Sequence, residues 1–154
     1  MPKCTILVGV PGSGKSTWML SQEILDNRYV ASTDAIIEQI AGGFNMTYDE
    51  GFKDLIKFAE KLMWKELTEF AEAGERIYID RTNLSVKSRK RYIDFLKPYG
   101  YEFDAVVFET PEGEEWKRRL NRPGKTIAAH VLESMADNIE IPTMDEGFTN
   151  ITFL

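Results

Sequence analysis

Nine residues near the amino terminus constrain this chain more than any others. The stretch from Gly9 to Thr17 fits the phosphate-binding pattern G-x-x-x-x-G-K-[ST] at every fixed position. A short apolar run, residues 5–8, precedes it, and a helical pattern, residues 18–25, follows it. Strand, glycine loop and helix is the context this loop requires, because the glycines let successive backbone N–H groups turn inward around an anion. The motif predicts an α/β protein that binds a nucleoside triphosphate.

The loop residues have distinct expected roles. Lys15 would reach the β- and γ-phosphates, and the Ser16 hydroxyl would ligate Mg²⁺. The remaining residues around the phosphates are predicted to be Pro11, Gly12, Ser13, Gly14 and Thr17. Phosphoryl chemistry is therefore expected at this end of the chain.

Composition and cysteine usage narrow the class of protein. The 154 residues predict one domain, 1–154, with 43% hydrophobic and 29% charged residues. A single cysteine, Cys4, excludes an intramolecular disulfide and a cysteine-based metal site, which suits a reducing compartment. The apolar run at the amino terminus is too short for a signal peptide or a membrane span. These features predict a cytoplasmic protein with no membrane association.

Charge is unevenly distributed along the chain. The net charge is −6, yet residues 81–125 carry 11 basic and 7 acidic side chains. A local basic surface facing phosphates is one interpretation, and the solvated face of a helix is an equal alternative. A short end of nucleic acid is compatible with this distribution, whereas extended coating of a duplex is not.

Strand and helix patterns alternate along the chain, which is typical of a parallel sheet covered on both faces. Strands are expected over 5–8, 29–32, 76–79, 103–108 and 148–154. Helices are expected over 34–41, 48–73 and 85–97, from the Thr110-Pro111 pair onward, and over 128–137. The pattern predicts a sheet of about five parallel strands flanked by helices, with a helical lid.

Two carboxylates follow predicted strands at the edge where ligands bind in such sheets. Asp34 is a candidate general base for an alcohol, although a helix N-cap explains it equally well. Asp80 has the form of an aspartate that holds Mg²⁺, and a strand-ending turn is its alternative. The next residues, Arg81, Thr82 and Asn83, are candidates to bind or orient the acceptor, and Arg81 would equally face solvent.

A basic segment from Arg118 to Lys125 is interrupted by Pro123-Gly124. In small-molecule kinases a mobile lid carries arginines onto the transferred phosphoryl group. Arg122 lies at the break and is predicted to be catalytic, whereas Arg118 would contact the nucleotide or simply stabilise a helix end. The only histidine, His130, is interpreted as structural. One histidine and one cysteine exclude nucleophilic triads and zinc hydrolysis.

Together these motifs resemble the polynucleotide 5′-hydroxyl kinases, including the kinase domain of T-even bacteriophages. The resemblance covers nearly the whole chain. It rests on the loop from Gly9 to Trp18, the D-x-T-N element at Asp80–Asn83, the segment Val131–Met135 and the tail Ile141–Phe148. It implies transfer of the ATP γ-phosphate to a 5′-OH end of DNA or RNA with Mg²⁺, Asp34 as the base and Arg122 as the lid arginine. No obligate protein partner is implied.

Two positions depart from this pattern. The bacteriophage enzyme has an arginine three residues after its base, where this chain has Ile37. Acceptor contacts would then come from Arg81, Lys87 or Arg89. The bacteriophage enzyme's second aspartate aligns with Arg81, whereas Asp80 matches the animal arrangement. Both departures leave a kinase of a small alcohol (a nucleoside, a modified base, a sugar or an antibiotic) as the alternative, and a nucleotide-dependent switch as a third hypothesis.

Overall fold

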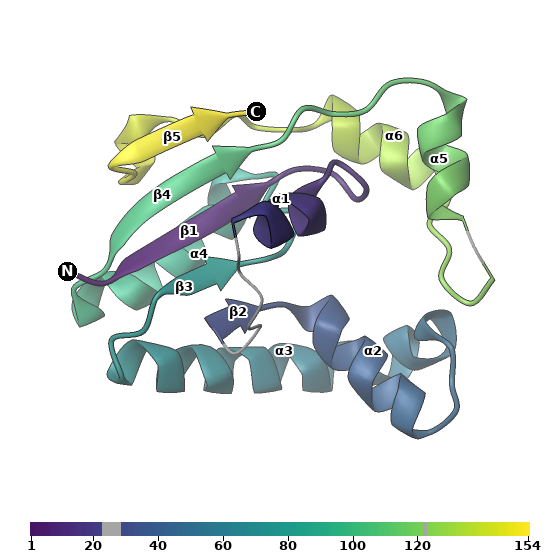
Figure 1. Cartoon of the computed structure of the whole chain (residues 1–154), viewed down its shortest axis with the longest axis horizontal. Helices are drawn as coiled ribbons and strands as arrows, with labels where there is room; N and C mark the ends of the chain where they lie inside the picture. The colour runs from purple at the N-terminus through teal and green to yellow at the C-terminus, as the bar shows by residue number, and fades with distance from the viewer. Residues whose placement is uncertain (23–28, 122) are drawn as a thin grey trace.

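The computed structural model describes residues 1–22, 29–121 and 123–154, and five parallel strands form its single sheet. The strand order is β2-β3-β1-β4-β5, so the strand that precedes the phosphate loop is central (Figure 1). The predicted parallel sheet of about five strands is confirmed. The strands are β1 (Lys3–Val8), β2 (Val30–Ala31), β3 (Ile77–Ile79), β4 (Glu102–Val107) and β5 (Asn150–Phe153).

Helices connect these strands, mostly where the sequence predicts them. The helix expected over 18–25 begins earlier, at Lys15, and residues 23–25 of that range lie outside the described residues. The Thr110-Pro111 start is wrong: that helix begins at Glu114, because Gly113 adopts a positive φ of 86° just before it. Gly42 and Gly43 also lie inside the end of their helix rather than beyond it. The helices are α1 (Lys15–Ser21), α2 (Thr33–Gly43), α3 (Tyr48–Glu72), α4 (Val86–Leu96), α5 (Glu114–Leu120) and α6 (Ala129–Asp137).

The two faces of the sheet have separate cores, as alternation along β1 requires. Ile6 and Val8 belong to the larger core, which includes Met63 of α3 and Leu96 of α4. Leu7 faces the other way and packs with residues of α1 and β4. Burying each such aliphatic side chain contributes about 1.5–3 kcal/mol. Helices therefore cover both faces and leave the carboxyl edge of the sheet for loops.

The α2–α3 pair stands beside that edge (Figure 1). Ser32 caps α2 by accepting from the Ala35 N–H, and Thr47 forms a capping box with Glu50 at the start of α3. Gly51 lets the two helices approach, because a Cβ there would lie 3.0 Å from the Ala41 Cβ. The capping fixes where the first turn of each helix meets the site.

A third apolar cluster joins α5 and α6 to the end of the phosphate loop. Val10, Trp116 and Leu132 form its buried centre. We call α5, α6 and residues 123–128 the lid. Within the described part of the chain, no helix combines the length and apolar character needed to cross a membrane.

Candidate functional site

The phosphate loop depends on glycine at the point where the lid covers it. Gly12 has a φ of +76°, and a Cβ there would lie 3.0 Å from both Leu120 Cδ2 and Trp116 Nε1. Trp116 Nε1 also donates to the Pro11 carbonyl oxygen at 2.8 Å. The loop is therefore held from above by α5 and tolerates no side chain at Gly12.

Two polar side chains of the loop fit a bound phosphate. Lys15 Nζ donates to the carbonyl oxygens of Gly9 and Val10, at 2.7 and 2.8 Å. Ser13 Oγ is buried with no hydrogen-bond partner among the described residues. A buried hydroxyl without a partner is costly, and a phosphate oxygen would satisfy it. Ser16 and Thr17 are exposed at the start of α1.

Burial and neighbouring charges shift the pKa values of two groups around this loop. Burial lowers the pKa of Lys15 to about 8, although the carboxylates of Asp80 and Asp34 oppose the shift. Burial raises the pKa of the Asp80 carboxyl, and the Lys15 ammonium opposes that shift. The three residues predicted to serve phosphoryl transfer thus interact electrostatically in one site.

The lowered pKa of Lys15 predicts proton uptake when a nucleotide binds. Near pH 9 most of the free lysine is neutral, whereas a bound triphosphate favours the ammonium, so binding should take up close to one proton near pH 9 and about none near pH 7. Calorimetry in two buffers of different ionisation enthalpy measures this uptake. A Lys15→Gln variant should lose it, and a wild-type protein that binds without uptake near pH 9 would contradict the assignment.

Asp34 is not a helix cap. Ser32 takes that role, so the alternative interpretation of Asp34 is excluded and its carboxylate remains available. The carboxylate is exposed and accepts a hydrogen bond of 2.5 Å from the Tyr48 hydroxyl at the start of α3. Burial and this bond to Asp34 raise the pKa of Tyr48 well above its usual range, so Tyr48 remains the donor.

The lid docks on the same helix pair. The Asp49 N–H donates to the Gly124 carbonyl oxygen at 2.8 Å, and the Asp49 carboxylate accepts from the N–H and hydroxyl of Thr126. Lys125 pairs with Glu38 of α2 and lies 4.4 Å from the centre of the Tyr48 ring. These contacts bring the lid loop against the residues that hold Asp34.

The structure describes one of the two arginines that were predicted to act from the lid, Arg118, and not the other, Arg122. Arg122 lies outside the described residues, so its assignment stays a prediction. Arg118 is exposed on α5, where it follows Trp116 by two residues. Its predicted contact with the nucleotide likewise stays a prediction.

The turn after Asp80 is tied to the phosphate loop through its backbone. The Gly9 N–H donates to the Thr82 carbonyl oxygen at 3.0 Å. Asn83 is buried, and its Nδ2 donates to the carbonyl oxygens of Leu7, Arg81 and Ile79 at 2.7, 3.1 and 3.4 Å. The amide of Asn83 thus joins two strands, and its predicted contact with the acceptor stays a prediction.

Five cations of the predicted basic segment form ion pairs among the described residues. Arg89 is fully buried against Glu146, so it cannot serve as the acceptor contact considered from the sequence. Arg81 donates to the Tyr92 hydroxyl and to Glu60. The other ion pairs of this segment are Lys90–Asp94, Lys117–Glu114, Lys117–Glu133 and Lys125–Glu38. These pairs neutralise part of the basic excess over 81–125, whereas Lys87, Arg91 and Lys97 remain exposed.

Two open pockets lie among the loops and helices around the sheet. One, of about 620 Å³, is lined by Arg81 and Thr82 after β3, Glu60 of α3, Ser88 and Arg91 of α4 and Ser134 of α6. The other, of about 700 Å³, extends from Ser13 and Trp18 to the residues that follow β4. Both volumes suit small ligands. The turn after Asp80 thus lines one pocket, and the phosphate loop lines the other.

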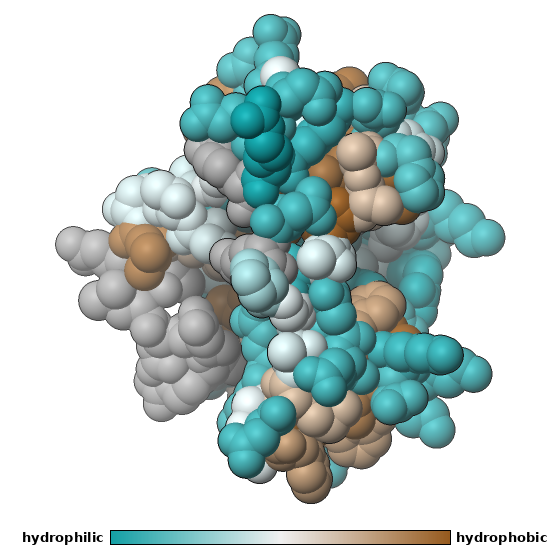
Figure 2. Space-filling model, turned by 90° about the vertical axis from the view of Figure 1, so that its right-hand side faces the viewer, coloured by the Kyte–Doolittle hydropathy of each residue, from teal (hydrophilic) through white to brown (hydrophobic). Residues whose placement is uncertain are grey.

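Figure 2 looks onto this edge of the molecule, with the lid above and the α2–α3 end below, and apolar surface appears among hydrophilic surface in both parts. On the helix pair, Phe44 after α2 and Phe52 of α3 are exposed. The lid and the helix pair are thus two distinct walls around the site.

The residues present fit a metal that arrives with the nucleotide. Among the described residues, no group of three or more His, Cys, Asp or Glu side chains is arranged to hold a metal ion. Ser16 and Asp80 supply oxygen ligands only, and Mg²⁺ is characteristically bound through one or two protein oxygens, phosphates and water. This donor set fits Mg²⁺ bound together with a triphosphate.

Comparison with known proteins places the chain in a family. The family model described as an AAA domain, AAA_33, matches residues 5–142. This chain is a member of that AAA domain family. A bifunctional polynucleotide phosphatase/kinase of Schizosaccharomyces pombe is 25% identical over 150 residues, which are 95% of this chain and 32% of that protein. The chain therefore spans about a third or less of the length of the curated relatives first matched.

Solved structures show the same fold. A predicted kinase of Chloroflexus aurantiacus has a TM-score of 0.71 at 16% identity, over 99% of this chain and 87% of that one. A sugar kinase of Janibacter has a TM-score of 0.58 at 23% identity, over 100% of this chain and 85% of that one. As an AAA domain with this architecture, the chain has the P-loop fold that the sequence predicts.

Three residues of the site were missed from the sequence. Trp116 covers the phosphate loop, Tyr48 donates to Asp34 and Lys125 joins the lid to α2. Each reaches its partner across a long sequence separation. Only Tyr48 gave a local signal, because it is the first residue after the Thr47 cap of a long helix.

Proposed function

We propose that this AAA domain transfers the γ-phosphate of ATP to the hydroxyl group of a small alcohol. The observation that carries the proposal is the arrangement around Lys15: the carboxylates of Asp34 and Asp80, which follow the neighbouring strands β2 and β3, both act on its ammonium. The turn that follows Asp80 in the sequence lines a pocket. A metal-binding or switch domain has no use for the second carboxylate. Phosphoryl transfer to an alcohol uses both.

The chemistry follows from the positions of the side chains. Lys15 would turn from the Gly9 and Val10 carbonyls to the β- and γ-phosphates, where its ammonium stabilises the charge that develops. Asp34 would accept the proton of the acceptor hydroxyl as the new O–P bond forms and the bond to ADP breaks. Mg²⁺, when bound with ATP, would neutralise part of the phosphate charge. The docked lid would exclude water, which protects against hydrolysis of ATP.

The form of the cavity supports a small acceptor. Its volume of about 620 Å³ lies in the range of small-molecule pockets. Arg81, which lines this pocket, already pairs with Glu60, so its charge is partly neutralised. The position that carries an acceptor-binding arginine in the bacteriophage kinases is Ile37, which is completely buried.

A polynucleotide 5′-OH end is the second candidate acceptor. The D-x-T-N element and the tail resemble polynucleotide kinases, and one distant relative is a polynucleotide phosphatase/kinase. A row of exposed lysines also runs along α3 from the site, formed by Lys53, Lys57, Lys61 and Lys65. Such a row, spaced by one helical turn, suits a phosphate backbone.

One assay separates these acceptors. The protein is incubated with γ-labelled ATP, Mg²⁺ and either a panel of nucleosides and sugars or a 5′-OH oligonucleotide. Label on a small alcohol supports the proposal, and label on the oligonucleotide alone favours the second candidate. Nucleotide binding without transfer to either pool would overturn both and favour a nucleotide-dependent switch.

The cavity assignment makes a separate prediction for Arg81. Arg81→Ala is expected to raise the KM of the acceptor about tenfold and to leave the KM of ATP within about twofold, because loss of one hydrogen bond to a charged group weakens binding by about that amount. Steady-state kinetics with each substrate varied in turn measure the two constants. Lys97→Ala, a change at an exposed lysine in the 3₁₀ turn after α4, is the matched control. An equal rise in both KM values would contradict the cavity as acceptor site.

A further inference from the structure

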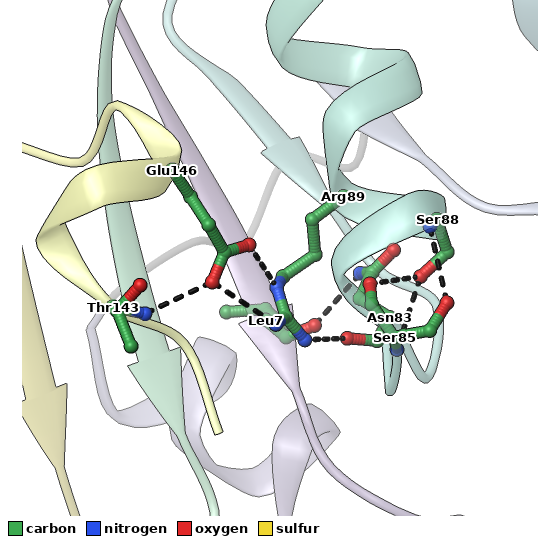
Figure 3. A network of polar contacts seen from close by, with 7 residues as sticks. All are labelled: Leu7, Asn83, Ser85, Ser88, Arg89, Thr143 and Glu146. Carbon is green, nitrogen blue, oxygen red and sulfur yellow. Dashed lines mark hydrogen bonds and ion pairs between the residues drawn. The ribbon is translucent and has the colours of Figure 1, made fainter. Parts of the chain in front are cut away.

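A buried ion pair connects the carboxyl-terminal segment to the turn after Asp80. Arg89 of α4 donates to Glu146 through Nε at 2.8 Å and through Nη2 at 3.1 Å. The side chains of Arg89 and Glu146 are 0% and 8% exposed. Glu146 also accepts from the Thr143 N–H at 2.9 Å, as Figure 3 shows. The carboxylate is therefore fixed from both sides.

The remaining guanidinium nitrogen of Arg89 contacts the turn that follows Asp80. Its Nη1 donates to the Asn83 carbonyl oxygen at 2.9 Å. Asn83 has a φ of +50°, a left-handed conformation that L-residues adopt at a cost. The bond from Arg89 holds the backbone in that conformation, so the side chain of Asn83 points toward Leu7 of β1 (Figure 3).

From Asn83 the connection continues to the phosphate loop. Asn83 Nδ2 donates to carbonyl oxygens at the ends of the two strands before the functional segments: Leu7 of β1, two residues before Gly9, and Ile79 of β3, directly before Asp80. The Thr82 carbonyl oxygen accepts from the Gly9 N–H. The β1–β3 ladder ends at the pair Ile6–Ile79, so beyond it this turn connects the phosphate loop to the segment that carries Asp80.

We infer that Arg89 and Glu146 are positioning residues for phosphoryl transfer, because together they fix the Arg81–Asn83 turn between the phosphate loop and Asp80. The inference rests on the proposed function for its catalytic consequence. It assigns a role to the carboxyl-terminal Thr143–Glu146 turn, which contributes no group to the reacting atoms. A displacement of about 1 Å in such a site is enough to lower a rate about a hundredfold.

The test must separate an effect on the geometry of the site from a loss of protein stability. Glu146→Gln keeps the shape and removes the charge. The double variant Arg89→Met/Glu146→Leu removes both charges together, and such apolar exchanges restore the stability that breaking a buried pair loses. Without the guanidinium, however, the double variant loses the hydrogen bond to the Asn83 carbonyl oxygen. Phe148→Leu, a buried change in the same segment with no polar link to the turn, is the matched control for lost packing.

We expect the double variant to melt close to the wild-type temperature and yet to have a kcat about 10–100-fold lower, with the KM of ATP changed much less. Phe148→Leu should lower the melting temperature and leave kcat unchanged below it. If the double variant recovers both stability and kcat, or if Phe148→Leu loses kcat equally, the role is merely structural and the inference fails.

A second measurement does not depend on transfer activity. Amide hydrogen exchange at Gly9 reports the bond to Thr82, and it should become about tenfold faster in the double variant than in Phe148→Leu. Unchanged Gly9 exchange in the double variant would overturn the inference even in a protein that transfers no phosphate. Faster exchange with no transfer by the wild type would instead refute only the proposed function.

Discussion

Replacing Asp34 with asparagine is expected to lower kcat by about 10²–10⁴-fold, the usual contribution of a positioned general base. Asparagine keeps the size of the side chain and still accepts the hydrogen bond from Tyr48, but it takes no proton from the acceptor hydroxyl. Ser32, rather than Asp34, caps α2, so the helix should remain intact. Single-turnover measurements of phosphoryl transfer give the chemical step directly.

Two controls accompany this prediction. ATP affinity should remain within about twofold of the wild type, since the lost interaction is made only in the transition state. Asp54→Asn makes the same exchange at an exposed carboxylate on α3 and should change kcat by less than about threefold. An Asp34→Asn protein that keeps more than a tenth of the activity would show that another group takes the proton.

Replacing Lys15 with methionine is expected to cause the second large loss of activity. The change removes the ammonium expected to lie against the β- and γ-phosphates, and kcat/KM should fall by about 10²–10³-fold, as for loss of one preorganised electrostatic group. The variant should nevertheless be more stable than the wild type. Because burial lowers the pKa of Lys15 to about 8, holding its charged form costs free energy in the folded protein at neutral pH. The melting temperature without ligand should therefore rise.

A matched exchange distinguishes this result from a general effect of methionine. Lys97→Met changes an exposed lysine in the 3₁₀ turn between α4 and β4, away from the phosphate loop. It should leave kinetics and melting temperature nearly unchanged. A Lys15→Met protein that is less stable than the wild type would show that the bonds to Gly9 and Val10 outweigh the cost of burying the charge.

Local patterns in the sequence predicted the sheet and most helix ends, because they are encoded within a few residues. Ser85 followed by a basic amphipathic run predicted α4, and Gly74, with a φ of +68°, ends the helix that it was expected to end. The one wrong helix start had a local cause as well. Thr110-Pro111 is a good start signal, yet Gly113 and the Trp116 anchor on the phosphate loop decide where α5 begins.

The links between distant segments could not be predicted in this way. Nothing near Arg89 in the sequence indicates that its guanidinium is buried against Glu146, 57 residues later. The same holds for Tyr48, whose hydroxyl meets a carboxylate that precedes it by 14 residues. Side chains of this kind look like solvated charges or core aromatics until the tertiary structure brings their partners together.

The contacts of Gly124 and Thr126 with Asp49 have a consequence for turnover. These bonds join the two walls of the site, so the lid can move away from the start of α3 only when they break. On the proposed function, product release would require this opening, a kind of step that limits turnover in many enzymes.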